Sequence, residues 1–570
     1  MIWLFALAFG VNARAAEVTQ KTDDVVLRQE GMEVIRNDDK IILRLDGAGA
    51  YGFGSVEPTD SEKALLLHAV ALLSKYHYDR YPIRISGYSG NPELSDERAR
   101  WIKALMVRQG LSSDDILTEG HGPNPSLIDE RGIEITVARR RELNLDAAGK
   151  AKAKTLADFL PEFSGYWLQE NAYQVRAPDG LSEAMNAVQL AAAGRINDNV
   201  SYKLSGRGIY DAAYALTNRY SAAVNNDMRS ELSVRDAFID ASFDNDDFRV
   251  GSQQIVWGES VGIFTADVVN ARDLREFILP DFEFIRTPKW AMDYEHDWGG
   301  VHSELVWSPI LQFDDINVPG APFSPAIPLP ARTPAVFNGT ITPANTLANS
   351  ESGIRLSYLI GGWDISAYEY YGWDHDPVLF RTIAPGGVYV FTPAYERLPI
   401  SGATFSKDLG AFVMHGEGIY SQGKYLPTLS VSSPDGVVRK DTIDATLGLS
   451  RSYFEHVDVS AQFIERDVLD YGSVPIFQEY PETHRFSLWM KGHFLDHHLE
   501  PEFTVISTIG HSDLMLNPRL NVNWGGNWAI AFGANIFEGN ENGLFGQFAG
   551  SSRVYSELRY QFEFNPRRPN

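Results

Sequence analysis

The sequence RVYSELRYQFEF, residues 553–564, alternates with a period of two. One set of alternate positions is apolar or aromatic except for Ser556, and it consists of Val554, Leu558, Tyr560, Phe562 and Phe564. The other set is polar or charged and includes Arg553, Glu557, Arg559, Gln561 and Glu563. A strand with lipid on one side and water on the other needs this pattern, so it predicts a strand of a transmembrane antiparallel β-barrel.

The same alternation recurs upstream, at residues 200–205, 443–450, 457–463, 519–524 and 528–534. A Gly525-Gly526 turn between the last two stretches predicts a hairpin. We therefore expect a barrel over residues 163–570. At roughly 25 residues per strand and connection, it has ~16 strands, with 14–18 in range. A barrel of this width leaves an aqueous lumen.

Composition agrees with this fold and excludes other classes. Aromatic residues make up 12% of the chain, and there is no cysteine. A closed barrel bonds every strand edge and does not depend on disulfides for stability. The net charge of -25 excludes a nucleic-acid partner, which requires a basic face.

The region before the barrel contains three predicted parts. Residues 2–11 are apolar and precede Ala13-Arg14-Ala15, so residues 1–15 are expected to be a secretory signal peptide. Residues 34–140 alternate strand signals (41–45, 82–86, 133–137) with helix signals (61–76, 95–109), which predicts a small α+β domain. Residues 141–162 form a linker. No later apolar run reaches the ~18 residues of a membrane helix.

The α+β domain resembles the OmpA-like family of peptidoglycan-binding domains. The matching stretches are residues 53–55 (FGS), 85–88 (ISGY), 94–99 (LSDERA) and 119–122 (EGHG). The resemblance implies that Arg98 binds the carboxylate of diaminopimelate in peptidoglycan. The family's aspartate is replaced by Gly90, so Asp96 or Glu93 is expected to face the ammonium group. The alternative is a fold of this family that serves only as a periplasmic plug or spacer.

The barrel resembles a large, functionally uncharacterised family of porin-like outer-membrane barrels of Gram-negative bacteria. The matching strings are GSQQIVWGES at 251–260 and ADVVNARDLREFILPD at 266–281. The resemblance implies transport or export, with an inner-membrane exporter as a partner. The fusion to an N-terminal OmpA-like domain is a departure from the family's pattern.

Residues 259–290 and 311–350 break the alternation. The second stretch is rich in proline and is excluded from the interior of a sheet. The first carries mixed charges, which create a transverse field at a channel constriction. We expect it to fold inward and line the pore; the alternatives are a salt-bridged plug or an outer loop. The candidate pore-lining residues are Glu259, Asp267, Arg272, Asp273, Arg275, Glu276, Asp281 and Arg286.

Other chemistry is weakly indicated. One turn carries residue types that can bind zinc, namely His493, Asp496, His497, His498 and Glu500. A polar hairpin connection is the favoured interpretation, so neither a metal nor a cofactor is predicted. No Gly-x-Ser-x-Gly elbow occurs in the barrel and no Walker motif is present, so we expect no catalytic residue and no enzyme. An outer-membrane hydrolase is a distant alternative.

Together these features predict an outer-membrane channel or export porin, embedded in outer-membrane lipid, with its N-terminal domain in the periplasm. The main alternative is a structural anchor that ties the outer membrane to peptidoglycan. Binding of peptidoglycan that depends on Arg98 distinguishes the anchor from the channel.

Overall fold

A computed structural model describes residues 17–21, 24–29, 32–36, 40–46, 83–88, 92–108, 116–121, 132–138 and 160–564. Within the last range, residues 198, 244, 259, 261–262, 299, 331, 361, 411, 454–455, 496 and 525–526 are not described. The chain divides into an N-terminal unit, mainly Met1–Phe159, and a second unit that holds most of the remaining residues.

The N-terminal unit is a seven-stranded sheet with strand order β1-β2-β3-β4-β7-β5-β6. Its strands are β1 Glu17–Lys21, β2 Asp24–Gln29, β3 Met32–Arg36, β4 Lys40–Asp46, β5 Ile83–Tyr88, β6 Ile116–His121 and β7 Gly132–Ala138. Helix α4, Pro92–Arg108, lies between the parallel strands β5 and β6 in sequence. Its apolar face, with Ala99, Ile102 and Met106 fully buried, packs on the sheet.

The predicted strands at 41–45, 82–86 and 133–137 and the predicted helix at 95–109 are present as β4, β5, β7 and α4. Strands β1 and β2 lie before the expected start of the domain at residue 34. The signal peptide at 1–15, the helix at 61–76 and all but the end of the linker at 141–162 lie outside the described residues. The OmpA-like assignment and the domain boundaries remain predictions.

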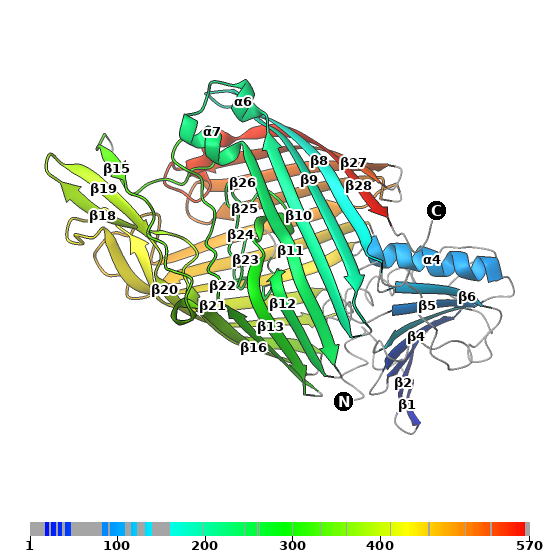
Figure 1. The fold of residues 1–570 in the computed structure, drawn as a ribbon. Helices are drawn as coiled ribbons and strands as arrows, with labels where there is room; N and C mark the ends of the chain where they lie inside the picture. Colours follow the sequence, from blue (N-terminus) through cyan, green and yellow to red (C-terminus); the bar gives the residue numbers. More distant parts are fainter. Residues whose placement is uncertain are drawn as a thin grey trace. The chain divides into compact units, whose positions relative to one another are not determined.

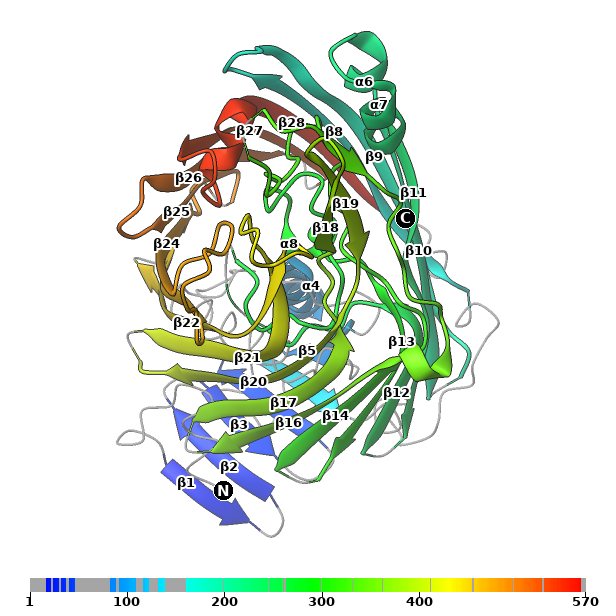
Figure 2. The same cartoon turned by 90° about the vertical axis from the view of Figure 1, so that its left-hand side faces the viewer.

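The second unit is a closed antiparallel β-barrel of 18 strands, in which the last strand pairs with the first (Figures 1 and 2). Its strands are β8 Glu162–Gln174, β9 Gly180–Arg195, β10 Val200–Asp211, β11 Ser230–Phe243, β12 Asp246–Gln253, β13 Lys289–Asp297, β14 Val301–Ser308, β16 Glu351–Ile360, β17 Trp363–Trp373, β20 Arg397–Asp408, β21 Val413–Pro427, β22 Val437–Tyr453, β23 Val457–Val468, β24 Glu482–Gly492, β25 Leu499–Thr508, β26 Asp513–Trp524, β27 Trp528–Gly539 and β28 Arg553–Phe564.

The expected number of about 16 strands is therefore too low. The error lies in the assumed spacing. Eighteen strands between Glu162 and Phe564 leave only about 22 residues per strand and connection, because one end of the barrel is built from tight turns. An even number of strands was expected, and an even number is found.

Alternation of side chains across the barrel wall is confirmed in β28. Val554 and Phe564 are 48% and 58% exposed on the outer face, whereas Arg553 and Tyr555 are buried toward the inside. On β11 the outer face is also apolar, and Leu232 is 89% exposed. A continuous apolar outer face opposite a polar inner face is typical of a barrel that meets lipid.

The two ends of the barrel differ. One end carries connections of no more than six residues, together with the start of β8 and the end of β28. The other end carries the four longest connections, at 212–229, 254–288, 309–350 and 374–396. The last two contribute β15 (Ala335–Phe337), β18 (Val378–Ala384) and β19 (Val388–Ala394) to a separate three-stranded sheet, seen at the left of Figure 1. The proline-rich stretch 311–350 thus contributes no strand to the barrel wall, in agreement with its exclusion from the interior of a sheet.

Among the described residues, no helix is both long and apolar enough to cross a membrane.

Candidate functional site

The connection 254–288, between β12 and β13, is bonded to strands on different sides of the ring. Two backbone N–H groups of this connection donate to Glu417 on β21. Ser260 N lies 2.7 Å from one carboxylate oxygen and Ala266 N lies 3.0 Å from the other. On β11, the guanidinium of Arg235 donates to the carbonyl oxygens of Glu283 and Arg286 at 2.6 and 2.7 Å. Its short helix α8, Phe282–Ile285, is drawn within the ring of strands in Figure 2.

Apolar packing fixes the first part of this connection. Trp257 is 1% exposed, and its ring lies 5.0 Å from that of Tyr368 and 6.0 Å from that of Tyr370, both on β17. Gly353 on β16 makes room for it, since an added Cβ would lie 2.6 Å from the indole. Burial of an aromatic ring of this size contributes several kcal/mol, about 3–5 by the cost of removing it.

Three of the predicted pore-lining residues form internal ion pairs. Arg286 pairs with Asp267. Two guanidinium nitrogens of Arg272, Nη2 and Nε, both donate to Oδ2 of the buried Asp314, at 2.8 and 3.0 Å. Burial acts to lower the pKa of Arg272, but the charge of Asp314 outweighs it and raises the pKa above its usual range. These pairs hold the connection together and tie it to the 309–350 connection.

Four other predicted residues line a cavity of about 150 Å³ between this connection and the barrel wall: Asp273, Arg275, Glu276 and Asp281. Arg275 pairs with Asp273 at 2.7 Å, with Asp315 at 3.2 Å and with Glu231 on β11. Burial acts to raise the pKa of Asp273, but hydrogen bonds from Arg275 and its charge hold that pKa below the usual range. The Asp273–Arg275 pair is therefore charged at neutral pH.

Arg553 on β28 is the centre of a second cluster in the same cavity. Its guanidinium lies 2.7 Å from Glu183 on β9, 2.8 Å from Glu276 and 3.7 Å from Glu170 on β8. Three carboxylates thus face one guanidinium. Such a group is stable only while the guanidinium is present, because like charges in a low-dielectric site repel strongly.

The whole lining carries more carboxylates than guanidinium groups. The carboxylates belong to Glu170, Glu183, Asp211, Glu231, Asp273, Glu276, Asp281 and Glu557, and the guanidinium groups to Arg207, Arg275, Arg519, Arg553 and Arg559. Eight acidic groups against five basic ones give the cavity a negative balance, which attracts cations.

The structure places the remaining candidates as follows. Glu259 lies outside the described residues. Arg98 is on α4 and is 5% exposed, and Asp96 is on the same helix, with its side chain outside the described set. Binding of peptidoglycan by these two residues stays a prediction.

Sequence analysis missed the barrel-wall half of the cavity. Arg553, Glu557 and Arg559 were recognised as one face of the last strand, but no role followed from that. Their partners on β8 and β9 are close only because β28 closes the ring against β8. Charged residues at the inward-facing positions of a strand with a period of two are the sequence signal that could have identified the wall residues of this cavity.

Fold and contacts together define an 18-stranded antiparallel β-barrel with a long connection bonded to its inner wall. The chain belongs to a family of proteins of unknown function, DUF1302, whose model matches residues 184–478. Both strings on which the barrel resemblance was based fall within that span.

No curated protein matches the chain. Among solved structures, OccAB1 of Acinetobacter baumannii is similar over 72% of this chain and 99% of its own, with 8% identity and a TM-score of 0.44. OccAB4 of the same organism matches over 72% and 100%, with 10% identity and a TM-score of 0.42. OccD3 (OpdP) of Pseudomonas aeruginosa matches over 74% and 97%, with 9% identity and a TM-score of 0.41.

Proposed function

We propose that this protein is an outer-membrane channel whose lumen is constricted by the 254–288 connection. The observation that carries the proposal is the bonding of one connection to Glu417 on β21, Arg235 on β11 and Arg553 on β28. A connection outside a closed ring cannot reach strands on different sides of it. Because the connection lies inside the ring, the open passage through the barrel is reduced to the charged cavity between the connection and the wall.

The outer face supports a membrane location. Exposed aromatic side chains lie near both ends of the strands, with Trp298, Trp524 and Phe564 near the short-turn end and Tyr173, Tyr210 and Tyr371 near the other. Two aromatic girdles with an apolar band between them match the two interfaces of a bilayer. Short turns are typical of the periplasmic end of such barrels, so we place that end in the periplasm.

The negative balance of the cavity points to the solutes. Cations and solutes with a cationic group are favoured over anions, because eight carboxylates face five guanidinium groups in the cavity lining. The paired arrangement of opposite charges also orients a dipolar solute across the passage. Small cationic or zwitterionic solutes are the class that this constriction fits.

Conductance and ion selectivity in planar bilayers test the proposal. Glu276→Gln removes a cavity carboxylate, so the cation-to-anion permeability ratio should fall relative to wild type. Arg275→Gln removes a cavity guanidinium, so the ratio should rise. Arg451→Gln is the matched control, because Arg451 is exposed on β22, outside the 254–288 connection, and does not line the cavity. Its permeability ratio should equal that of wild type.

Absence of channel conductance in the correctly folded wild type would contradict the proposed function. If the Glu276 and Arg275 variants conduct with the same permeability ratio as wild type, the protein is a channel, but ion selection does not take place in this cavity.

A further inference from the structure

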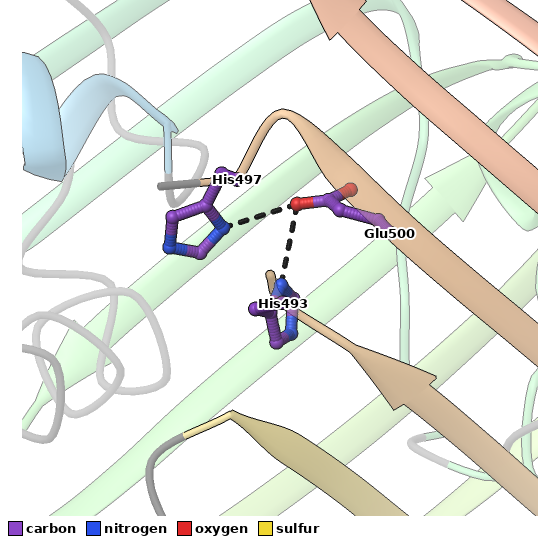
Figure 3. Close-up of side chains that lie close together, drawn as sticks. All are labelled: His493, His497 and Glu500. Carbon is purple, nitrogen blue, oxygen red and sulfur yellow. Dashed lines mark hydrogen bonds and ion pairs between the residues drawn. The ribbon is translucent and has the colours of Figure 1, made fainter. Parts of the chain in front are cut away.

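The turn between β24 and β25 brings two imidazoles and a carboxylate to one point. Nδ1 of His493 lies 3.2 Å and Nδ1 of His497 lies 3.1 Å from the same atom, Oε1 of Glu500 (Figure 3). The three candidate ligand atoms all lie within 4.8 Å of one another. The cluster is at the short-turn end of the barrel, and none of its three residues lines the charged cavity.

These distances fit a tetrahedral metal. Zinc binds imidazole nitrogen and carboxylate oxygen at about 2.0–2.2 Å, which places neighbouring ligand atoms about 3.3 Å apart. Two of the three edges, at 3.1 and 3.2 Å, are already near this value, and the third lies within 4.8 Å and must shorten when the metal binds. Magnesium and calcium prefer oxygen ligands, so two imidazoles favour zinc or a similar transition metal.

The surroundings of the ligands are those of a metal site. Nε2 of His493 lies 2.9 Å from Oδ2 of Asp458 on β23. Zinc-binding histidines commonly donate from one ring nitrogen to a carboxylate in this way. Nδ1 of His493, which here faces Glu500, becomes a ligand when its proton is released on metal binding. The second oxygen of Glu500 lies 3.3 Å from Nζ of Lys491, which leaves Oε1 turned toward the two imidazoles.

We propose that the β24–β25 turn binds one Zn²⁺ ion through Nδ1 of His493, Nδ1 of His497 and Oε1 of Glu500. Water fills the fourth position, since the side chain of His497 is 51% exposed and the site is open to solvent. The ion ties the end of β24 to the start of β25, and Asp458 extends the connection to β23 as a positioning residue. The inference does not depend on the channel proposal.

Binding of Zn²⁺ to the purified, folded full-length protein in detergent tests the site, with an affinity tag that contains no histidine. Calorimetry should give one Zn²⁺ per chain, and Co²⁺ should produce the visible absorption bands of a tetrahedral site. His493→Ala and His497→Ala should each weaken binding at least tenfold. Asp458→Asn should weaken it by about 10–100-fold through loss of the support of His493.

His498→Ala is the matched control. This histidine is in the same turn, but its Nδ1 bonds to the carbonyl oxygen of Leu495 at 2.7 Å, outside the cluster. Its affinity for Zn²⁺ should equal that of wild type. A folded barrel migrates differently in a gel before and after heating, and this difference verifies that each variant is folded.

Two results would overturn the proposal. One is binding that the His493 and His497 variants retain at wild-type strength. The other is an equal loss in the His498 variant, which would indicate nonspecific binding by exposed imidazoles.

Discussion

Glu417 holds the 254–288 connection against β21, and its removal should release that connection from the barrel wall. Its two carboxylate oxygens accept the backbone N–H groups of Ser260 and Ala266 at 2.7 and 3.0 Å, and the residue is 5% exposed. A hydrogen bond to a charged group contributes about 1.5–3 kcal/mol. Glu417→Ala therefore removes about 3–6 kcal/mol of docking free energy.

Glu417→Gln should have an intermediate effect. The glutamine carbonyl can accept one of the two N–H groups, while its amide cannot accept the other, so about half of the docking free energy is lost. Since 1.4 kcal/mol corresponds to a tenfold change in population, even the smaller loss raises the undocked fraction by about tenfold or more.

Two assays report undocking. Trypsin should cleave the folded barrel after Arg272 or Arg275 faster in the order wild type, Glu417→Gln, Glu417→Ala, because both arginines are shielded when the connection is docked. Single-channel recordings should show larger and noisier conductance in the same order.

Glu369→Ala is the control for loss of a carboxylate from the barrel wall. Glu369 faces outward on β17 and accepts a hydrogen bond from Ser401, on the neighbouring strand. Equal cleavage rates and equal conductance in wild type and Glu417→Ala would refute the view that this residue holds the connection in the lumen.

Three further changes have expected outcomes. Trp257→Ala should lower the free energy of docking by about 3–5 kcal/mol and raise tryptic cleavage, since the indole is almost fully buried; unchanged cleavage would contradict this. Arg553→Met leaves three carboxylates that face one another without a guanidinium group. It should lower the free energy of unfolding, measured by urea titration, by about 3–5 kcal/mol, and it should raise the cation-to-anion permeability ratio. Leu190→Arg, on the outer face near the middle of β9, should lower stability in lipid vesicles by about 2–4 kcal/mol, whereas an equal change at Leu495, in a turn, should have little effect.

The barrel could be predicted from sequence because alternation is a local property. Each residue's side of the wall depends on its position within one strand, so a stretch such as β28 reveals itself without its neighbours. Strand number depends instead on the connections. These range from two residues, as at 361–362, to the whole of 309–350, and an average spacing does not capture that range.

The candidate site was predictable only in part, for a related reason. The charges of Arg275 and Glu276 are visible in sequence as a break in alternation. Which charge meets which depends on register and on closure of the ring. Arg553 and Glu183 are separated by 370 positions, and no local pattern links them.

That last contact has a consequence for how the molecule is assembled. Arg553 is on the final strand, and its partners Glu170 and Glu183 are on the first two strands of the barrel. The cluster forms only when β28 pairs with β8 and closes the ring, a closure that costs chain entropy because it joins distant parts of the sequence. Glu276 joins the same guanidinium, so the inward connection acquires this bond at the moment when the seam shuts. A barrel that has not closed lacks one of the bonds that hold the 254–288 connection, and that bond forms in the same step as the seam.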